Sequence, residues 1–274
     1  MNSKKLSHAV QVVSEAGYIA MRYFNQLHEL HIEEKKKLDF VSNADISVEK
    51  YIIEALGSIY PKDGFIGEES EFKQATTSQL DADRDGYWVI DPIDGTSNFI
   101  NHINYWCISV AYYDCRQQKV TLAIIHQPCL NKLFASERGA GVYLNGVELP
   151  RIDKKLDEIS RKKALIGLGT GTSVPLDIEI KIITFVKSLS VGYRKLSCCA
   201  LMLTEVVTGS YRGYFEPKIN SWDCLAGLMM IEELGGITND FLASTQNLLS
   251  GNVLLAGTPE FYPTIKPLLA MKMV

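Results

Sequence analysis

Residues 88–99, which read WVIDPIDGTSNF, constrain the fold and the chemistry of this chain more than any other segment. The apolar, aromatic and β-branched run at 87–90 is typical of a buried strand. Two aspartates, Asp91 and Asp94, follow it directly. Pro92 lies between them, and because proline has no backbone N–H we expect the hydrogen-bonded ladder of the strand to end there. The segment therefore predicts a strand that delivers two carboxylates at its carboxyl end.

The residues beside the two aspartates add further polar groups. The carbonyl of Ile93 can face the same ion as the carboxylates, and hard cations such as Mg²⁺ prefer such clustered oxygens. Gly95 and Thr96 offer backbone N–H groups and one hydroxyl, which suit a phosphate beside the metal. An Asp-Pro pair alone would indicate an ordinary solvated turn, but the whole string favours a metal and phosphate site.

The composition is that of an ordinary globular protein. Hydrophobic residues make up 46% of the 274 residues and charged residues 22%, which argues against disorder. The length permits one large domain or two smaller ones. The formal net charge of −4 provides no overall basic field for nucleic acid. The basic clusters at 35–37 and 161–163 are short, and we expect them to be solvated surface.

The cysteines and the apolar runs bear on the compartment. Six cysteines occur without a CxxC pair or the spacing of a zinc site, so we expect reduced thiols and a cytoplasmic protein. Polar residues interrupt the amino-terminal segment, which therefore predicts an amphipathic helix and not a secretion signal. No apolar run approaches the roughly 18 residues that a membrane-spanning helix needs, so we expect no membrane association.

Hydrophobic spacing predicts two long helices and then a sheet in the first part of the chain. Apolar residues recur at helical intervals over 6–30 and 46–60. The pattern then changes to alternation, which predicts an antiparallel sheet covered by the two helices, and Asn145-Gly146 marks a hairpin turn. The predicted strands of this part are 65–67, 87–90, 108–113, 120–125, 132–136 and 141–144.

After Pro150 the predicted helices and strands alternate. We therefore expect two lobes, at about 1–150 and 151–274. The elements expected in the second lobe are strands at 164–168, 211–216 and 253–256, helices at 177–188, 200–208 and 223–234, and a last helix near the carboxyl terminus.

Three further motifs carry acidic residues at helix starts and strand ends. VSNAD supplies Asp45, GEES supplies Glu68 and Glu69, and SWD supplies Asp223. Taken singly, an acid at a helix N-terminus stabilises the helix dipole, and an acid at a strand end is ordinarily just solvated. Their occurrence together with the 91–99 string favours one shared site.

Together these motifs resemble the inositol monophosphatase family of magnesium-dependent phosphatases, over nearly the whole chain and in the same order. The family motif D-P-x-D-G-T-x-N-F is met at 91–99 without exception, and W-D…E-x-G-G is met by Trp222-Asp223 and by 234–236. The resemblance implies a single domain over 1–274. Its fold would be an α+β or α/β layered α-β-α-β-α sandwich, of the inositol monophosphatase and fructose-1,6-bisphosphatase type.

The resemblance also implies a set of metal ligands for two or three Mg²⁺ ions. Glu68, Asp91 and the carbonyl of Ile93 would hold the first ion. Asp91, Asp94 and Asp223 would hold the second. Glu69 would shape a weaker third site or support the other ligands from behind.

Catalytic and substrate-binding residues follow from the same resemblance. The Thr96 hydroxyl, oriented by Asp45, would position the attacking water, with Glu68 as the third catalytic residue. Glu216 matches the carboxylate that accepts hydrogen bonds from substrate hydroxyls. The full set of substrate contacts would be Asp94, Gly95, Thr96, Cys199 and Glu216.

Two positions depart from the family pattern, and both concern the substrate. Residues 197–200 read Ser-Cys-Cys-Ala where the family commonly has a small glycine-threonine/serine-alanine segment that contacts the substrate through its backbone. Lys218 stands where relatives often have glycine. We expect this lysine to add positive charge near the leaving group, which would suit a second phosphate or carboxylate on the substrate.

The expected activity is Mg²⁺-dependent hydrolysis of a small phosphate monoester by a metal-activated water, with myo-inositol monophosphate as the first candidate. Alternatives are fructose 1,6-bisphosphate, histidinol phosphate and adenosine 3′,5′-bisphosphate. A different class is a protein that interacts with the transcription machinery and has vestigial activity, for which the basic pair Arg194-Lys195 leaves room.

The resemblance further implies a homodimer and inhibition by lithium. The expected partner is otherwise a small phosphorylated metabolite. We do not expect the chain to bind nucleic acid.

Overall fold

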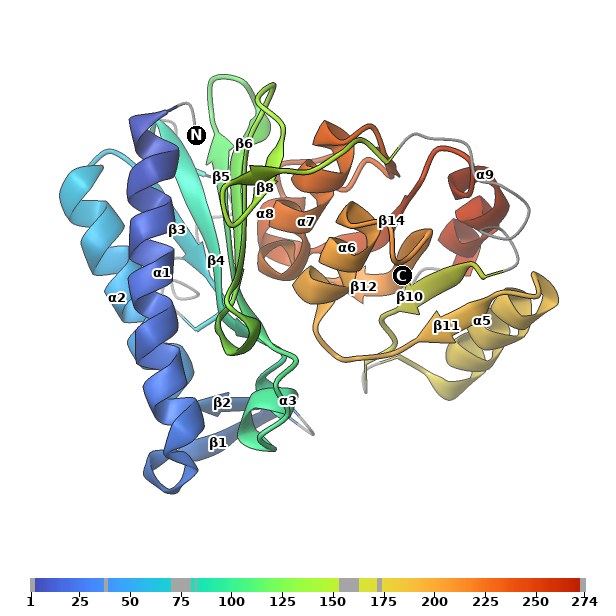
Figure 1. The fold of residues 1–274 in the computed structure, drawn as a ribbon, viewed down its shortest axis with the longest axis horizontal. Coiled ribbons are helices and arrows are strands. Elements are labelled where there is room, and N and C mark those ends of the chain that lie inside the picture. Colours follow the sequence, from blue (N-terminus) through green and yellow to red (C-terminus); the bar gives the residue numbers. More distant parts are fainter. Residues whose placement is uncertain are drawn as a thin grey trace.

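The computed structural model of this chain describes residues 3–36, 39–69, 80–81, 83–152, 163–171 and 174–271. These residues form five layers in which helices and sheets alternate (Figure 1). Two helices cover the outer face of a large sheet, two more lie between this sheet and a smaller one, and a last group covers the far face of the smaller sheet. This order confirms the predicted α-β-α-β-α sandwich.

The first layer consists of α1 (Lys4–Asn25) and α2 (Asn43–Ile59). Ser3 caps α1 by accepting a hydrogen bond from the N–H of Leu6 at 3.1 Å, which satisfies one of the free N–H groups of the first turn. Small and apolar residues at helical spacing bury one side of α1 against the sheet. The helix ends earlier than predicted and is followed by a 3₁₀ turn, η1 (Leu27–Glu29).

The large sheet has seven strands in the order β3-β4-β5-β6-β7-β8-β9, all antiparallel except the pair β3 and β4. Because side chains alternate along a strand, Trp88 and Ile90 of β4 face the first helical layer, while Tyr87 and Val89 face the middle layer. The strands are β3 (Gly64–Gly67), β4 (Gly86–Asp94), β5 (Cys107–Asp114), β6 (Lys119–Gln127), β7 (Lys132–Glu137), β8 (Val142–Leu144) and β9 (Val147–Glu148).

β4 does not end at Pro92, contrary to our expectation. It continues to Asp94, and its pairing with β5 is irregular between Asp91 and Asp94. An irregularity of this kind leaves residues without ladder hydrogen bonds, so it accommodates a proline that has no N–H to donate. The irregular pairing also changes the alternation of side chains, and Asp91 and Asp94 both lie buried near the carboxyl end of β4.

The middle layer contains α6 (Cys199–Val207) and α7 (Ser221–Glu233), which pack on both sheets. The second sheet is mixed, with the order β11-β10-β12-β14-β13. Its far face is covered by α5 (Leu176–Ser188), α9 (Tyr262–Ile265) and the 3₁₀ segment η4 (Lys266–Met271). The strands are β10 (Leu165–Leu168), β11 (Gly192–Arg194), β12 (Gly213–Ile219), β13 (Ile237–Thr238) and β14 (Asn252–Gly257).

Two hairpins illustrate what the pattern did and did not predict. The Asn145-Gly146 turn is confirmed, since both residues have positive φ and the turn joins β8 to β9. The hairpin of β1 (Ile32–Lys36) and β2 (Asp39–Ser42) was missed, because β1 is charged and lacks the alternation of a half-buried strand. This hairpin lies beside α3 (Thr96–Ile100), next to the predicted site (Figure 1). The short elements η3 (Pro128–Leu130) and α8 (Asn247–Ser250) complete the described secondary structure.

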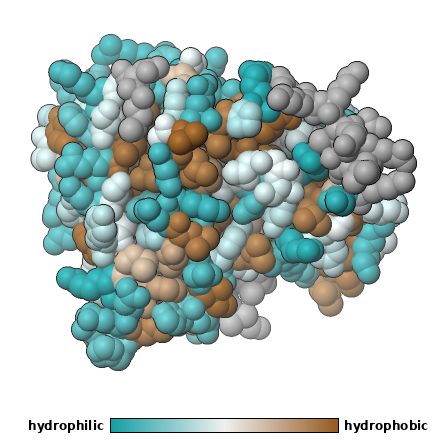
Figure 2. All heavy atoms as spheres, in the orientation of Figure 1, coloured by the Kyte–Doolittle hydropathy of each residue, from teal (hydrophilic) through white to brown (hydrophobic). Residues whose placement is uncertain are grey.

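On the face of the molecule seen in Figure 2, hydrophobic side chains lie in several separate groups with hydrophilic ones between them. In the described part of the chain, no helix is both long and apolar enough to cross a membrane. The six cysteines are all free thiols, as expected.

Candidate active site

Three carboxylates from distant segments meet at the end of β4. Glu68 follows β3, Asp91 lies on β4, and Asp223 lies in the first turn of α7. One carboxylate oxygen of each lies within 4.8 Å of the other two. We call these three residues the carboxylate group. β3 and β4 run parallel, so their carboxyl ends lie at the same edge of the sheet and place two of the three acids there.

Asp91 is the most constrained member of this group. Its side chain is fully buried, and its Oδ1 accepts a hydrogen bond from the N–H of Ile93 at 3.0 Å. Its Oδ2 is buried without a hydrogen-bond partner among the described residues. A buried carboxylate oxygen without a partner is costly, so its position indicates that a positively charged group belongs there.

Asp45 and Asp223 are placed by the start of a helix. Asp45 Oδ2 accepts from the N–H of Ser42 at 2.9 Å, and Asp223 Oδ2 accepts from the N–H of Asn220 at 3.2 Å. Both acids are at the third helical position, where such a bond satisfies a free N–H before the helix. Each helix start therefore both gains a cap and fixes a carboxylate in the site.

Asp45 also reaches the hydroxyl of Thr96. Asp45 Oδ1 lies 3.3 Å from Thr96 Oγ1, while Oδ2 accepts from the Ser42 hydroxyl at 2.6 Å. The Thr96 hydroxyl is also 3.0 Å from the carbonyl of Ile93. Because a hydroxyl has one hydrogen and two lone pairs, Thr96 can donate to one of these acceptors and still accept a hydrogen bond from water.

The turn between β4 and α3 requires glycine. Gly95 has φ of 92°, in the left-handed region that a residue with Cβ rarely adopts. A Cβ there would also lie 3.1 Å from the carbonyl oxygen of Tyr105 and 3.2 Å from the Cβ of Cys198. The close approach brings Thr96 and the start of α6 to the same cavity.

Asp94 connects β4 to α6. Its carboxylate accepts from the N–H of Ala200 at 2.6 Å, from the N–H of Cys199 at 3.2 Å and from the thiol of Cys198 at 3.2 Å. The thiol of Cys198 is in turn 3.8 Å from that of Cys107. The first N–H groups of α6 are thus directed at a carboxylate and not at open solvent.

Lys35 contacts the acids from the β1–β2 hairpin. Its Nζ lies 3.3 Å from Glu68 Oε1 and also contacts Glu69, whose N–H donates to Glu49 at 3.0 Å. Burial opposes the charged form of Lys35, but the carboxylates of Glu68 and Glu69 outweigh it and raise its pKa. We expected the basic cluster at 35–37 to be solvated surface, and for Lys35 this was wrong.

Burial raises the pKa values of the site carboxyls. The pKa of Glu68 rises to about 8 and that of Asp223 to about 7, in each case through burial and then through repulsion from a neighbouring carboxylate. Burial likewise raises the pKa of Asp94 to about 7 and that of Asp45 to about 6, and it holds the pKa of Asp91 well above the usual range.

The donor set fits divalent metal ions. Two carboxylates 4 Å apart repel by about 4 kcal/mol at an effective dielectric constant of about 20, and one lysine offsets only part of this. Divalent cations would remove the repulsion and restore the ionised form of each acid. Glu68, Asp91 and Asp223 offer only oxygen atoms as metal ligands, and Mg²⁺ and Ca²⁺ prefer oxygen ligands. The unpartnered Oδ2 of Asp91 is consistent with such an ion.

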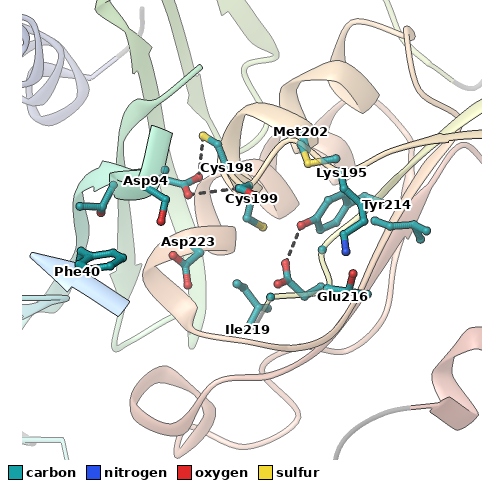
Figure 3. A pocket seen from close by; sticks show the side chains of 18 residues that line it. Phe40, Asp94, Lys195, Cys198, Cys199, Met202, Tyr214, Glu216, Ile219 and Asp223 are labelled. Carbon is teal, nitrogen blue, oxygen red and sulfur yellow. Dashed lines mark hydrogen bonds between the residues drawn. The ribbon is translucent and has the colours of Figure 1, made fainter. Parts of the chain in front are cut away.

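A cavity of about 290 Å³ opens beside the carboxylate group (Figure 3). This volume is near the lower end of the roughly 300–1,000 Å³ typical of small-molecule sites, so it suits a small metabolite. One wall carries Asp94 and Asp223, and the wall across from it carries Tyr214, Glu216 and Lys195. The five predicted substrate contacts all line it, namely Asp94, Gly95, Thr96, Cys199 and Glu216.

Glu216 is built into the far wall. Its buried carboxylate accepts a hydrogen bond from the hydroxyl of Tyr214 at 2.6 Å, and burial raises its pKa to about 8. A Cβ at Gly169 would lie 2.1 Å from this carboxylate, so only glycine permits the backbone of 168–171 to pass so close.

The whole chain matches one family of known proteins. Residues 1–272 match the model of the inositol monophosphatase family. The chain belongs to the inositol monophosphatase family. Among curated relatives, the inositol-1-monophosphatase of Rhizobium meliloti (strain 1021) is 33% identical and covers 92% of this chain and 91% of its own. The Nus factor SuhB of Escherichia coli (strain K12) is 30% identical and covers 97% of this chain and 94% of its own.

Solved structures show the same fold. The extragenic suppressor protein suhB from Bartonella henselae superposes with a TM-score of 0.84 at 27% identity, over 97% of this chain and 98% of that one. The Thermotoga maritima IMPase superposes with a TM-score of 0.79 at 23% identity, over 98% of each chain. The inositol monophosphatase fold is therefore confirmed.

Membership of the inositol monophosphatase family indicates a phosphatase, but the relatives carry two kinds of name. One is an inositol-1-monophosphatase and several are Nus factors named SuhB. The names therefore do not single out a substrate. They also give no support to the expectation that nucleic acid is not a partner.

The predicted site residues lie together, although their roles stay predictions. Asp45 and Thr96 contact each other, and Asp94 lies beside the carboxylate group. Glu69 contacts Lys35 and lies outside the carboxylate group itself. The backbone N–H of Cys199 is used by Asp94, so a substrate would have to contact another part of Cys199.

Lys218 does not occupy the place we expected. It is exposed and is not among the residues that line the cavity. Strict alternation along β12 would put it on the same face as Glu216, but the pairing of β12 with β14 is irregular between Glu216 and Ile219. This irregularity turns the lysine away from the cavity.

The residues of the site that were missed from the sequence include Lys35, Phe40, Lys195 and Tyr214. Phe40 and Lys195 line the cavity, and Lys35 contacts the acids. None of them belongs to the motifs that indicated the site, and only tertiary structure brings them to it. In the sequence, Lys195 stands out only as part of the basic pair Arg194-Lys195.

Proposed function

We propose that this chain is a Mg²⁺-dependent phosphomonoesterase for small phosphate esters, with myo-inositol monophosphate as the first candidate substrate. The observation that carries the proposal is the carboxylate group at the edge of the cavity, in which Asp91 Oδ2 is buried without a partner. Membership of the inositol monophosphatase family supports the reaction class. The name of the Rhizobium meliloti relative supports the substrate.

Metal binding in this proposal follows the carboxylates. Glu68, Asp91 and the Ile93 carbonyl would hold one Mg²⁺ ion, and Asp91, Asp94 and Asp223 a second. When bound, the ions supply positive charge that lowers the pKa of an attacking water and stabilises the leaving oxygen. The contact of Glu69 with Lys35 leaves it beside these ligands, where it would support them or shape a third site.

The protein's own groups would orient the nucleophile. The Thr96 hydroxyl can donate to Asp45 and accept a hydrogen bond from a water, so the pair fixes the direction of that water. Glu68 lies close to the same edge of the cavity and would accept its proton. Gly95 and Thr96 would contact the phosphate oxygens.

At the far wall, Glu216 would accept hydrogen bonds from substrate hydroxyls. Tyr214 and the backbone at Gly169 hold its carboxylate in place. A polyol such as inositol satisfies this geometry, and so do the sugars of fructose 1,6-bisphosphate and adenosine 3′,5′-bisphosphate, whereas histidinol phosphate has no free hydroxyl. The alternatives are fructose 1,6-bisphosphate, histidinol phosphate and adenosine 3′,5′-bisphosphate.

A screen of phosphate release across these compounds, with Mg²⁺ and with EDTA, tests the proposal directly. We expect release that depends on Mg²⁺ and is fastest with an inositol monophosphate. Release that persists unchanged in EDTA would exclude the metal mechanism. A faster reaction with another compound would keep the mechanism and change the substrate.

The second candidate function is an interaction with the transcription machinery, favoured by the relatives named Nus factor SuhB. Asp94→Asn separates the two functions, because it should abolish turnover and leave the outer surface unchanged. A cellular phenotype that survives this substitution in full would support the interaction. A phenotype lost together with turnover would support the enzyme.

Assembly as a homodimer is part of the same proposal, and it rests on the family. Light scattering at micromolar concentration should give twice the chain mass. A monomer would refute the dimer and leave the catalytic proposal intact.

Inhibition by Li⁺ is expected from the charge of the site. A small monovalent ion at Asp91, Asp94 and Asp223 would retain phosphate after the alcohol has left but would supply half the charge. Tens of millimolar LiCl should lower the steady-state rates, with an uncompetitive pattern. Asp223→Asn should weaken the inhibition. Rates unaffected by LiCl would show that this second site differs from that of its relatives.

A further inference from the structure

The cavity wall that faces the carboxylate group carries a cation. Among the described residues that line the cavity, Asp94, Asp223 and Glu216 are acidic, and Lys195 is the single lysine or arginine. Figure 3 shows Lys195 across the cavity from Asp94 and Asp223, beside Tyr214 and Glu216. A substrate with its phosphate at the carboxylate end would therefore extend its remote part toward an ammonium group.

Lys195 is held on this wall by a contact that a ligand can replace. Its Nζ pairs with Oε1 of Glu179 on α5, and the Thr170 hydroxyl donates to the same oxygen at 2.9 Å. The side chains of Lys195 and Glu179 are 37% and 23% exposed, so water reaches the pair. Exposed ion pairs of this kind contribute little to stability. An anionic group on a ligand can therefore take the ammonium from Glu179 at small cost.

The segment 168–171 ties this cation to Glu216. The N–H of Gly169 donates to the carbonyl of Phe215 at 2.9 Å, and Gly169 packs directly on the Glu216 carboxylate. The next residue, Thr170, lines the cavity and contacts Glu179. Lys195 and the glutamate that faces the substrate are therefore positioned by the same short stretch of backbone.

We propose that Lys195 forms a subsite for a second anionic group, a phosphate or a carboxylate, on a small polyol phosphate. The inference rests on the proposed phosphatase function. It gives the cavity an order, with the reacting phosphate at the carboxylate group, hydroxyls at Glu216 and the second anion at Lys195. A hydrogen bond between an ammonium and an anion is roughly twice as strong as one between neutral groups, so the subsite favours doubly anionic substrates.

Two matched substrate pairs test this preference. The first pair is myo-inositol 1,4-bisphosphate and myo-inositol 1-phosphate, which differ by a second phosphate at the opposite end of the ring. The second pair is glucuronate 1-phosphate and glucose 1-phosphate, which differ by a carboxylate at the far end of the sugar. The readout is the ratio of kcat/KM within each pair, measured in Mg²⁺, and the pair with the larger ratio tells whether the second anion is phosphate or carboxylate.

Three variants give different expected ratios. Lys195→Met should lower the ratio about tenfold, as expected for loss of a hydrogen bond to a charged group, and Lys195→Arg should largely retain it. Glu179→Gln should raise the ratio, because it removes the carboxylate that competes for the ammonium. Lys218→Met is the control, since this exposed lysine lies outside the cavity and should leave the ratio unchanged. A structural defect alone would not move Lys195→Met and Glu179→Gln in opposite directions.

The subsite is overturned if Lys195→Met leaves both ratios unchanged, or if Lys218→Met lowers them equally. Failure of the proposed function would look different, since no compound would then release phosphate in any variant. In that case calorimetry with Ca²⁺ in place of Mg²⁺ still decides the subsite. Tighter binding of inositol 1,4-bisphosphate to the wild-type chain than to Lys195→Met supports it, and equal binding overturns it.

Discussion

The wall of the cavity that carries Asp94 and Asp223, with the buried Asp91 beside them, is fixed by secondary structure, whereas the wall that carries Glu216 and Lys195 is fixed by side chains and glycine contacts. On the first wall the acids occupy a strand end and the first turn of a helix, positions set by the backbone. On the second, one tyrosine hydroxyl and one exposed ion pair hold the polar groups. The proposed metal ligands are therefore held by the backbone, while the proposed substrate contacts depend on side chains that single substitutions can alter.

The largest effect should come from the rigid wall. Asp91→Asn removes a buried carboxylate common to both proposed ions, so kcat should fall by about 10³-fold or more, about 4 kcal/mol of barrier. In EDTA at pH 8 the variant should be at least as stable as wild type, because it relieves repulsion within the carboxylate group.

Asp114→Asn is the matched control, since this acid lies at the opposite end of the same pair of strands. It should leave kcat unchanged. Equal activity of wild type and Asp91→Asn would disprove the metal-binding role of the carboxylate group.

The next effect concerns the nucleophile. Thr96→Val keeps the shape of the side chain and removes the hydroxyl that, in the proposed mechanism, links Asp45 to the attacking water. We therefore expect kcat to fall about 10²-fold with little change in KM. Thr96→Ser keeps a hydroxyl and should retain most of the activity. A loss in Thr96→Ser as large as in Thr96→Val would point to packing and not to the hydroxyl. Steady-state kinetics at saturating Mg²⁺ give both quantities.

The rigid wall should also show itself in stability. The folded-state pKa values of Glu68, at about 8, and of Asp94 and Asp223, at about 7, lie above those of the unfolded chain. The metal-free folded state therefore binds more protons than the unfolded state between about pH 4 and 8. As pH rises through this range, the contribution of these carboxyls to the free energy of unfolding falls.

Divalent ions compete with those protons, so stabilisation by Mg²⁺ should be larger at pH 8 than at pH 6. At 100 times Kd it should reach about 2.7 kcal/mol, roughly 5–10 °C in Tm for a chain of this size. Thermal denaturation in EDTA and in Mg²⁺ at the two pH values measures it. A Mg²⁺ increment independent of pH would show that these carboxyls do not bind the ion.

The smallest effect is expected at the cavity wall that carries Glu216 and Lys195. Glu216→Gln keeps the size of the side chain but weakens its hydrogen bonds to substrate hydroxyls, so KM for inositol 1-phosphate should rise about fivefold, about 1 kcal/mol. kcat should change less than twofold. p-Nitrophenyl phosphate is the control, since it has no hydroxyls and its KM should not change. An equal rise in both KM values would mean that Glu216 acts on the fold of the wall and not on the substrate.

The same contrast explains how much the sequence predicted. Residues 91–99 and the acids Asp45, Glu68 and Asp223 were found because a strand end and a helix start have recognisable local patterns. The layered fold followed from hydrophobic spacing and from the family resemblance. Lys35 and Lys195 were missed because their place in the site arises only when distant segments pack together.

Two errors share one physical cause. β4 continues past Pro92, and Lys218 turns away from the cavity, because each strand is irregular at that point. Regular alternation and a simple proline rule both assume an unbroken ladder. Irregular pairing cannot be read from residue types alone, and it occurs here on the two strands that supply Asp91 and Glu216.

The carboxylate group joins parts of the chain that are far apart in sequence, since Glu68 precedes β4 and Asp223 follows most of the second sheet. Two ions that share Asp91, one also held by Glu68 and the other by Asp223, would together act as a reversible crosslink that closes a very long loop. Unlike a disulfide, which restricts the unfolded chain, such an ion leaves when the chain unfolds, so it stabilises by binding the folded chain alone. The cofactor would thus serve as a staple as well as a catalyst, in a chain whose six cysteines form no disulfide.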